Sequence, residues 1–272
     1  MNFFRKFFGY FKDANGNLSP YSDGGGSGAF DDFRWWLWVA SVAILAFLLY
    51  FVFKKHKKVG KIFIIAVVST LLGVRFINQV VRACIGAEYP FWRAIPFHPC
   101  TVMTFVLPLT ILCKWDKIKT PVFVISIMCG LITMFVNDYF DNWFLTFSSF
   151  EGIVAHSILF LIPIYEVAIG EFRIDYKKWW HIVVGMVILI VWAMLANLIL
   201  IYGCGISANY MYLMHNALPF GGNSPVYLVY YVLIFCVFMA LILGLPELAR
   251  YIKKRTNPEA EKSQQVETNT KK

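Results

Sequence analysis

The sequence predicts an all-α membrane protein, a polytopic bundle of seven transmembrane helices with the N-terminus outside and the C-terminus in the cytoplasm. Of its 272 residues, 59% are hydrophobic and only 15% are charged, whereas ordinary soluble domains carry about 25% charged residues. Several apolar runs reach the length that crosses a membrane. Lys and Arg gather in short segments between these runs, which is typical of multispanning proteins.

Residues 1–33 form an N-terminal segment outside the predicted bundle. Phenylalanines from Phe3 to Phe11 recur at helical spacing, with basic residues up to Lys12 among them. This pattern predicts a short amphipathic helix at the membrane surface. The stretch from Asn15 to Ala29 is rich in Gly, Ser and Asn, which is typical of a flexible linker. No cleavable signal peptide is expected, because the N-terminus lacks a compact apolar core before a small-residue cleavage site.

Seven apolar runs within residues 34–246 are the predicted spans. The third, fourth and fifth runs are short, so we expect them to extend into their flanks or to lie in a thin part of the bundle. The remaining residues, 247–272, form a polar cytoplasmic tail whose end is expected to be disordered. The runs cover 35–53, 60–82, 98–113, 120–137, 152–169, 180–202 and 224–246.

The distribution of basic residues orients the bundle. Five Lys lie in 54–61, three basic residues each in 114–119 and 170–179, and seven in the tail. The three alternate connections contain only Arg93. Because Lys and Arg are retained in cytoplasmic loops, this asymmetry puts the C-terminus inside and outweighs the three basic residues near the N-terminus. The net charge of +9 is therefore explained by topology, and nucleic acid is not an expected partner.

Cys100 is the strongest candidate for chemistry. It ends the segment Ile-Pro-Phe-His-Pro-Cys, which stands directly before the third apolar run. Proline is favoured at the first helical position, so Pro99 there makes His98 the cap residue and Cys100 the second residue of the helix. The free N–H groups and dipole of a helix N-terminus favour the thiolate, the reactive form of cysteine.

His156 is the predicted partner of Cys100. The third span runs inward from His98 and the fifth runs inward from Gly152, so both side chains are expected in the same outer layer. A thiol and an imidazole at one depth form the minimal nucleophile–base pair for acyl transfer. The alternative is that His156 is a packed, hydrogen-bonded membrane histidine. Asp138 and Asn209 are candidates to orient the ring as the third member of a triad, although Asp138 is also explained by exposure to outside water.

Polar residues in the second span form a further candidate group. Arg75 and Asn78 share one helical face, and Arg75 lies deep enough to point into the bundle and bind a lipid phosphate. A disulfide between Cys84 and Cys204, which fall near connections on one side, remains open. The chain has no P-loop, no dinucleotide-binding glycine motif and no zinc-peptidase motif, so no cofactor or metal is expected.

These motifs resemble the YwaF-like family of bacterial integral membrane proteins, which is related to an animal acyltransferase of ether lysophospholipids. The resemblance covers roughly residues 60–245 and includes Ala155-His156-Ser157 and the stretch from Asn209 through Tyr212 to Leu213. It implies a bacterial plasma-membrane acyltransferase acting on phospholipids. In that case Cys100 accepts an acyl chain as a thioester, and His156 acts as base and then as acid.

Three functions are consistent with these observations. The leading interpretation is a lipid acyltransferase or lipid-ester hydrolase near the outer leaflet, with His98, Asn209 and Tyr212 lining its site. The second is a non-enzymatic transporter or small-ligand-binding component that uses Arg75 and Asn78 as a polar site. The third is a structural or sensory membrane protein. The oligomeric state does not follow from the sequence.

Overall fold

The computed structural model describes residues 29–84, 95–135, 139–140, 142–216, 222 and 224–256, together with Phe3, Phe7, 10–12 and 18–20. At 10–12, 18–20, 81–84, 249–250 and 253–254 it describes the backbone only.

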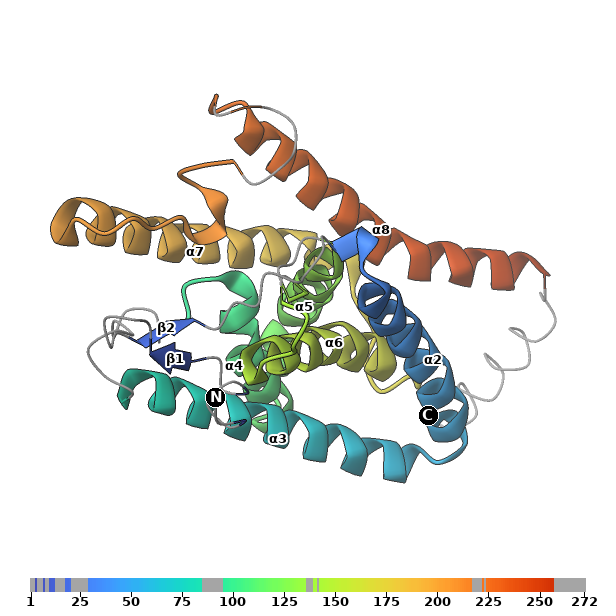
Figure 1. The fold of residues 1–272 in the computed structure, drawn as a ribbon. Coiled ribbons are helices and arrows are strands. Elements are labelled where there is room, and N and C mark those ends of the chain that lie inside the picture. Colours follow the sequence, from blue (N-terminus) through green and yellow to red (C-terminus); the bar gives the residue numbers. More distant parts are fainter. Residues whose placement is uncertain are drawn as a thin grey trace. The chain divides into compact units, whose positions relative to one another are not determined.

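Seven α-helices carry the apolar runs of the described chain (Figure 1). Six of them are long and apolar enough to cross a membrane, while α4 has only 14 residues. Fourteen helical residues extend about 21 Å, which is less than the ~30 Å hydrocarbon core of a bilayer. The sequence therefore predicted the position of each helix, but one of the seven is shorter than a full span. The helices are α2 (Phe33–Lys55), α3 (Lys57–Cys84), α4 (Pro99–Leu112), α5 (Asp116–Phe135), α6 (Phe147–Ala168), α7 (Trp179–Leu198) and α8 (Tyr227–Thr256).

The N-terminal segment differs from its prediction. Phe3 and Phe7 are helical and their rings stack with centroids 5.9 Å apart, as expected of i, i+4 neighbours. Two short strands, β1 (Tyr10–Lys12) and β2 (Leu18–Pro20), then pair antiparallel. The prediction of an amphipathic helix is therefore wrong at residues 10–12, and the prediction of a flexible linker is wrong at residues 18–20. These residues form two strands that hydrogen-bond to each other.

Local signals set where the helices begin. Asp32 caps α2 by accepting a hydrogen bond from the backbone N–H of Arg34 at 2.8 Å. Thr146 caps α6 in the same way through Ser149 N–H, at 3.3 Å. Pro99 is the first residue of α4, where its missing N–H costs nothing.

The centre of the main unit is formed by α5 and α6, which pack against each other. Helix α5 also contacts α4 and α7, and α6 contacts α2, while α3 packs against α4 (Figure 1). This arrangement brings α3, α4, α5 and α6 around one shared interior, in which Arg75, Asn78 and His156 are buried.

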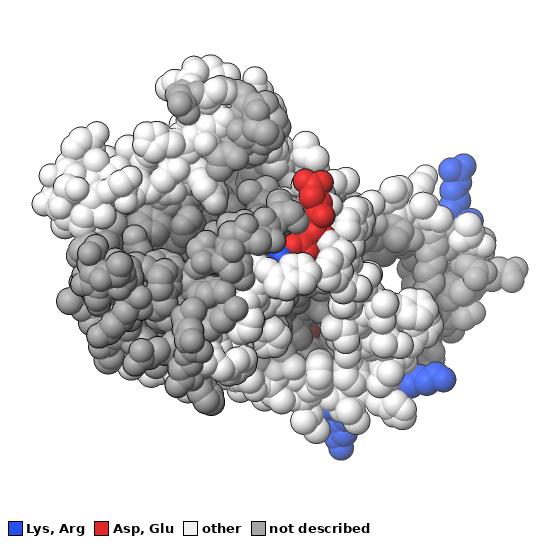
Figure 2. Space-filling view, in the orientation of Figure 1, with Lys and Arg blue, Asp and Glu red and all other residues white. Residues whose placement is uncertain are grey.

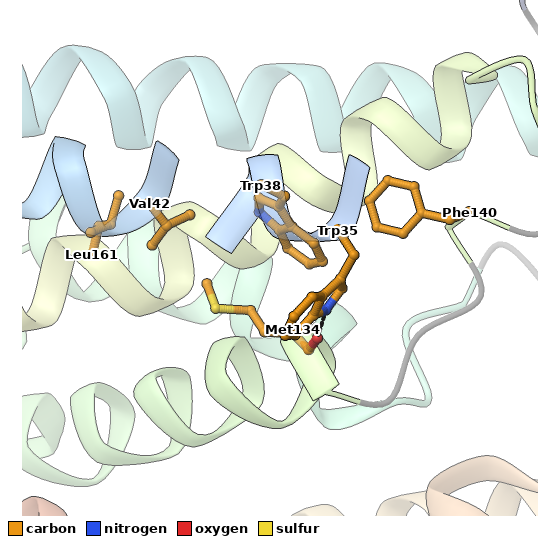
Figure 3. Packing of buried hydrophobic residues seen from close by; sticks show 6 residues of the cluster. All are labelled: Trp35, Trp38, Val42, Met134, Phe140 and Leu161. Atoms are coloured by element: carbon orange, nitrogen blue, oxygen red, sulfur yellow. Dashed lines mark hydrogen bonds between the residues drawn. The ribbon is translucent and has the colours of Figure 1, made fainter. Parts of the chain in front are cut away.

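An aromatic cluster fixes α2 against α5 and α6 (Figure 3). Trp35 donates from its indole Nε1 to the carbonyl of Met134, at the end of α5. Trp38 donates from Nε1 to Ser157 Oγ at 2.8 Å, one residue after His156. Each buried indole therefore packs its apolar ring in the cluster while its N–H group is hydrogen-bonded. The Trp38 bond attaches α2 to α6 next to His156.

Two ion pairs gather the basic connections at one end of the bundle. Lys61 Nζ lies 2.7 Å from Glu171 Oε2, and Lys119 Nζ lies 2.6 Å from Glu166 Oε2. The first contact joins 54–61 to 170–179, and the second joins 114–119 to the C-terminal end of α6.

The outer surface of the bundle is suited to lipid. Large apolar side chains such as Phe47, Ile62 and Ile188 are more than half exposed, and the described residues on the face shown in Figure 2 include few charged side chains. Exposed apolar area on this scale is stable in a bilayer and unstable in water. The chain is a multi-pass membrane protein.

A second compact unit contains residues 174–177 and 216–272, including α8. Within it, Tyr231 Oη donates to Asn216 Oδ1 at 3.3 Å, and the rings of Tyr227 and Tyr231 meet edge to face.

Candidate active site

The N-terminus of α4 presents Cys100 in its first turn. His98 is the N-cap residue, with φ −76° and ψ 141°, Pro99 is the first helical residue and Cys100 follows it. This confirms the predicted order. The Cys100 sulfur lies near the backbone N–H groups of Cys100 and Thr101 and near the Thr101 hydroxyl. The thiol is half-buried, so it is sheltered but not sealed.

The cap is made by the backbone alone. The carbonyl of His98 accepts a hydrogen bond from Val102 N–H at 2.9 Å, but the His98 side chain makes no capping hydrogen bond. Its ring packs instead against Tyr210 and Tyr212, with centroids 5.1 and 6.2 Å away. His98 and Tyr212 therefore lie together beside the entrance of α4.

His156 is buried in α6 with one nitrogen engaged and the other free. Its Nδ1 lies 2.7 Å from the carbonyl oxygen of Gly152 and 3.1 Å from the hydroxyl of Tyr139. A carbonyl oxygen only accepts, so Nδ1 carries the proton in the neutral ring and Nε2 presents a lone pair. Nε2 is buried and has no hydrogen-bond partner among the residues that the structure describes. This is the tautomer that a general base requires.

Gly152 makes room for the tyrosine that contacts the histidine. A Cβ at residue 152 would lie 2.5–2.9 Å from three atoms of the Tyr139 ring, which is closer than real contacts allow. The absence of a side chain at Gly152 therefore lets Tyr139 reach the imidazole.

A buried ion pair lies beside the histidine in the same interior. Arg75 Nε is 2.7 Å from Glu151 Oε1, and the two side chains are 9% and 5% exposed. Asn78 Nδ2 donates weakly to Glu151 Oε2 at 3.4 Å. Arg75 therefore faces the bundle interior, as its depth in the span predicted, but its Nε is committed to a carboxylate. Its two Nη groups make no hydrogen bond to any described residue.

These groups share one electrostatic environment contributed by four helices. Arg75 of α3 lies within electrostatic range of Cys100 and His156, and Cys129 of α5 lies within the same range of Cys100. In the described part of the chain no hydrogen bond joins Cys100 to His156. The structure thus gathers a thiol, an imidazole and a cation around one interior.

Asn209, one of the two predicted orienting residues, makes its hydrogen bonds within its own loop and not with the histidine ring. Asn209 accepts hydrogen bonds from Met214 N–H and His215 N–H at 3.0 and 3.1 Å, so it organises its own loop. Asp138 lies outside the described residues. The ring is oriented by Tyr139 and Gly152 instead.

The possible disulfide between Cys84 and Cys204 is not formed in the structure as far as Cys204 shows, because Cys204 is a free cysteine. The side chain of Cys84 is not among those that the structure describes.

Sequence reasoning missed two members of this group, Tyr139 and Glu151. Glu151 carried a usable signal, because a buried arginine in a span needs a buried anion at the same depth. Tyr139 carried none, since it lies in a connection and reaches the ring only because residue 152 is glycine.

The fold and the gathered residues define a multi-pass membrane protein with a polar centre enclosed by its helices. The chain belongs to the TMEM164 family, a transmembrane protein family whose model matches residues 29–243. No curated protein and no solved structure matches the chain.

Proposed function

We propose that the chain is a cysteine-dependent lipid acyltransferase, with lipid-ester hydrolysis as the related reaction when water is the acceptor. The observation that supports this most directly is the unpartnered Nε2 of His156, buried in the interior that also receives Cys100. A buried nitrogen without a partner costs free energy, so its retention favours a role that uses the lone pair.

The proposed nucleophile is the Cys100 sulfur. Its position in the first turn of α4 puts unpaired backbone N–H groups beside it, which favour a developing thiolate. These N–H groups are also candidates to stabilise the oxyanion that forms when sulfur adds to an ester carbonyl.

The proposed reaction has two balanced halves. His156 Nε2 takes the thiol proton and the Cys100 sulfur adds to the ester carbonyl of a donor phospholipid. The carbon–oxygen bond then breaks, and the released lysolipid oxygen receives the proton from Nε2, leaving a thioester. In the second half Nε2 takes the proton of the acceptor hydroxyl, the acceptor oxygen bonds to the acyl carbon, and Cys100 leaves and regains the proton.

The substrate ester is proposed to bind beside Cys100 and His156, with its carbonyl carbon against the sulfur. No hydrogen bond joins Cys100 to His156 among the described residues, and catalytic hydrogen bonds often form or tighten only when substrate binds. The Nη groups of Arg75, which make no hydrogen bond to a described residue, suit a lipid phosphate or carbonyl oxygen, while Glu151 pairs with its Nε.

We propose that this centre faces the outer leaflet of a bacterial plasma membrane. The ion pairs of Lys61 and Lys119 hold basic connections at one end of the bundle, while α4 begins at its other end. The positive-inside rule then assigns the Cys100 end to the outside.

The test is to express the wild type, Cys100→Ala and His156→Ala and to supply an alkyne-labelled phospholipid. The wild type is expected to carry a hydroxylamine-sensitive label on Cys100 and to alter the acyl profile of the membrane. Cys100→Ala should carry no label, and His156→Ala should acylate at least about 100-fold more slowly, the usual contribution of a general base.

Matched controls are Cys113→Ala, at the other end of α4, and His181→Ala, at the start of α7. Both should retain the wild-type label. An unlabelled wild type with lipid profiles equal to those of both site variants would sink the proposal. A small anion that raises the melting temperature equally in the wild type and Cys100→Ala would instead favour the transporter interpretation.

A further inference from the structure

A strap formed by residues 209–215 packs against the segment that leads into Cys100. The ring of Tyr210 lies 4.9 Å from the ring of Phe97 and 5.1 Å from that of His98, centroid to centroid. Tyr212 adds a second contact to His98. The residues that enter α4 are therefore held by side chains from a distant part of the chain.

One buried amide anchors this strap to α7. Asn197 accepts a hydrogen bond from Tyr210 N–H at 2.7 Å and donates one to the carbonyl of Tyr210 at 3.0 Å. Asn197 is fully buried, and a buried amide in a membrane span is costly unless its groups are satisfied. Here a single backbone residue satisfies both, so the amide is matched to Tyr210.

The strap is held in a conformation that requires such an anchor. Met211 and Tyr212 have φ of 56° and 55°, in the left-handed region that residues other than glycine rarely adopt. Asn209 supports the turn by accepting from two N–H groups beyond it. Backbone strain of this kind persists only where surrounding contacts impose it.

Helix α7 also holds the same segment directly. Trp192 donates from its indole Nε1 to the carbonyl of Pro96 at 2.9 Å, and its ring lies 5.3 Å from that of Phe97. Phe97 is thus contacted by Trp192 on α7 and by Tyr210 on the strap.

We propose that Asn197 is a positioning residue for Cys100. Asn197 fixes the backbone of Tyr210, and Tyr210 in turn holds residues 96–98 in place; we call this set of contacts the clamp. The clamp fixes the position of the first turn of α4, and it limits the access of reagents to the Cys100 thiol. The relevance of this clamp to catalysis rests on the proposed function. Its effect on the position and accessibility of the Cys100 thiol does not.

The test is the rate at which a water-soluble alkylating reagent modifies Cys100 in the purified full-length protein, read from the Cys100 peptide by mass spectrometry. Asn197→Ala removes two buried hydrogen bonds, so the rate is expected to rise roughly tenfold through local opening. Trp192→Phe removes one hydrogen bond but keeps a ring against Phe97, so it should produce a smaller rise. Leu195→Ala, an exposed position on α7, should leave the rate unchanged.

The other cysteines and the melting temperature separate positioning from unfolding. Cys113 is exposed at the far end of α4 and should react at the same rate in every variant. An unchanged Cys100 rate in folded Asn197→Ala would overturn the proposal, and so would an equal rise at Cys129. If Asn197→Ala does not fold, the alkylation rate of Cys100 in Trp192→Phe tests the proposal: a rise supports it, and an unchanged rate overturns it. Because alkylation requires no lipid substrate, these outcomes stand apart from success or failure of acyl transfer.

Discussion

At the scale of single residues, the ion pair of Arg75 and Glu151 is the costliest feature of the site. Both side chains are almost fully buried, and each charge is tolerable only while the other is present. The pair places a cation beside Cys100 and His156 without leaving an uncompensated charge in the membrane interior.

Neutralising one partner of this ion pair is therefore expected to destabilise the protein strongly. Glu151→Gln should lower the free energy of unfolding by about 3 kcal/mol or more, because the guanidinium remains buried without its carboxylate. The double variant Arg75→Gln/Glu151→Gln should lose much less than the sum of the two single losses. Unfolding in detergent, followed by circular dichroism, measures all three.

The exposed pair of Lys61 and Glu171 is the matched control, since its side chains are 55% and 25% exposed. Lys61→Gln should cost less than about 1 kcal/mol, as surface ion pairs do. Equal losses for Glu151→Gln and Lys61→Gln would contradict the importance of burial.

The sequence alone predicted some residues of this site but not the contacts between them. Cys100 was predictable because a proline–cysteine pair before an apolar run has a definite position in a helix. The contacts of His156 were not predictable, because they depend on a tyrosine from a connection and on the room that Gly152 leaves. The anchor of Tyr210 by Asn197 is likewise a contact between distant segments that no spacing reveals.

At the scale of helices, close approach of α5 and α6 fixes the site. A Cβ at Gly130 would lie 2.7 Å from the carbonyl oxygen of His156 and 2.8–2.9 Å from atoms of Phe160. Small residues at such crossings let membrane helices pack through their backbones. Gly130 thus sets the distance between α5 and the turn of α6 that carries the proposed base.

Gly130→Ala is expected to push the helices apart at this crossing. Overpacking of this kind costs about 1–3 kcal/mol, and the melting temperature should fall accordingly. The control is Gly73→Ala on α3, where the new Cβ meets nothing within 4 Å. There the substitution should be neutral or stabilising by about 0.5–1 kcal/mol, because alanine favours the helix. A Gly130→Ala protein as stable as Gly73→Ala would refute the close-packing argument.

At the scale of the whole molecule, composition and charge predicted the helical bundle because they reflect the membrane directly. Apolar runs located all seven apolar helices, and the ion pairs of Lys61 and Lys119 bring the basic connections together. The shortness of α4 was visible, because 98–113 is the shortest of the seven apolar runs and α4 covers Pro99–Leu112 within it. The β1–β2 pair was not visible, because the first twenty residues carry a helical phenylalanine pattern.

Two exposed native thiols make the orientation of the bundle testable. Cys113 ends α4 beside the basic connection 114–119, and Cys204 follows α7 at the end that carries the Asn197 anchor. From the positive-inside rule we expect Cys113 in the cytoplasm and Cys204 outside. In right-side-out spheroplasts, a membrane-impermeant maleimide should therefore label Cys204 and spare Cys113. Permeabilised membranes should label both, which controls for reactivity. Labelling of Cys113 alone before permeabilisation would reverse the topology, and the proposed acyl transfer would then belong to the cytoplasmic leaflet.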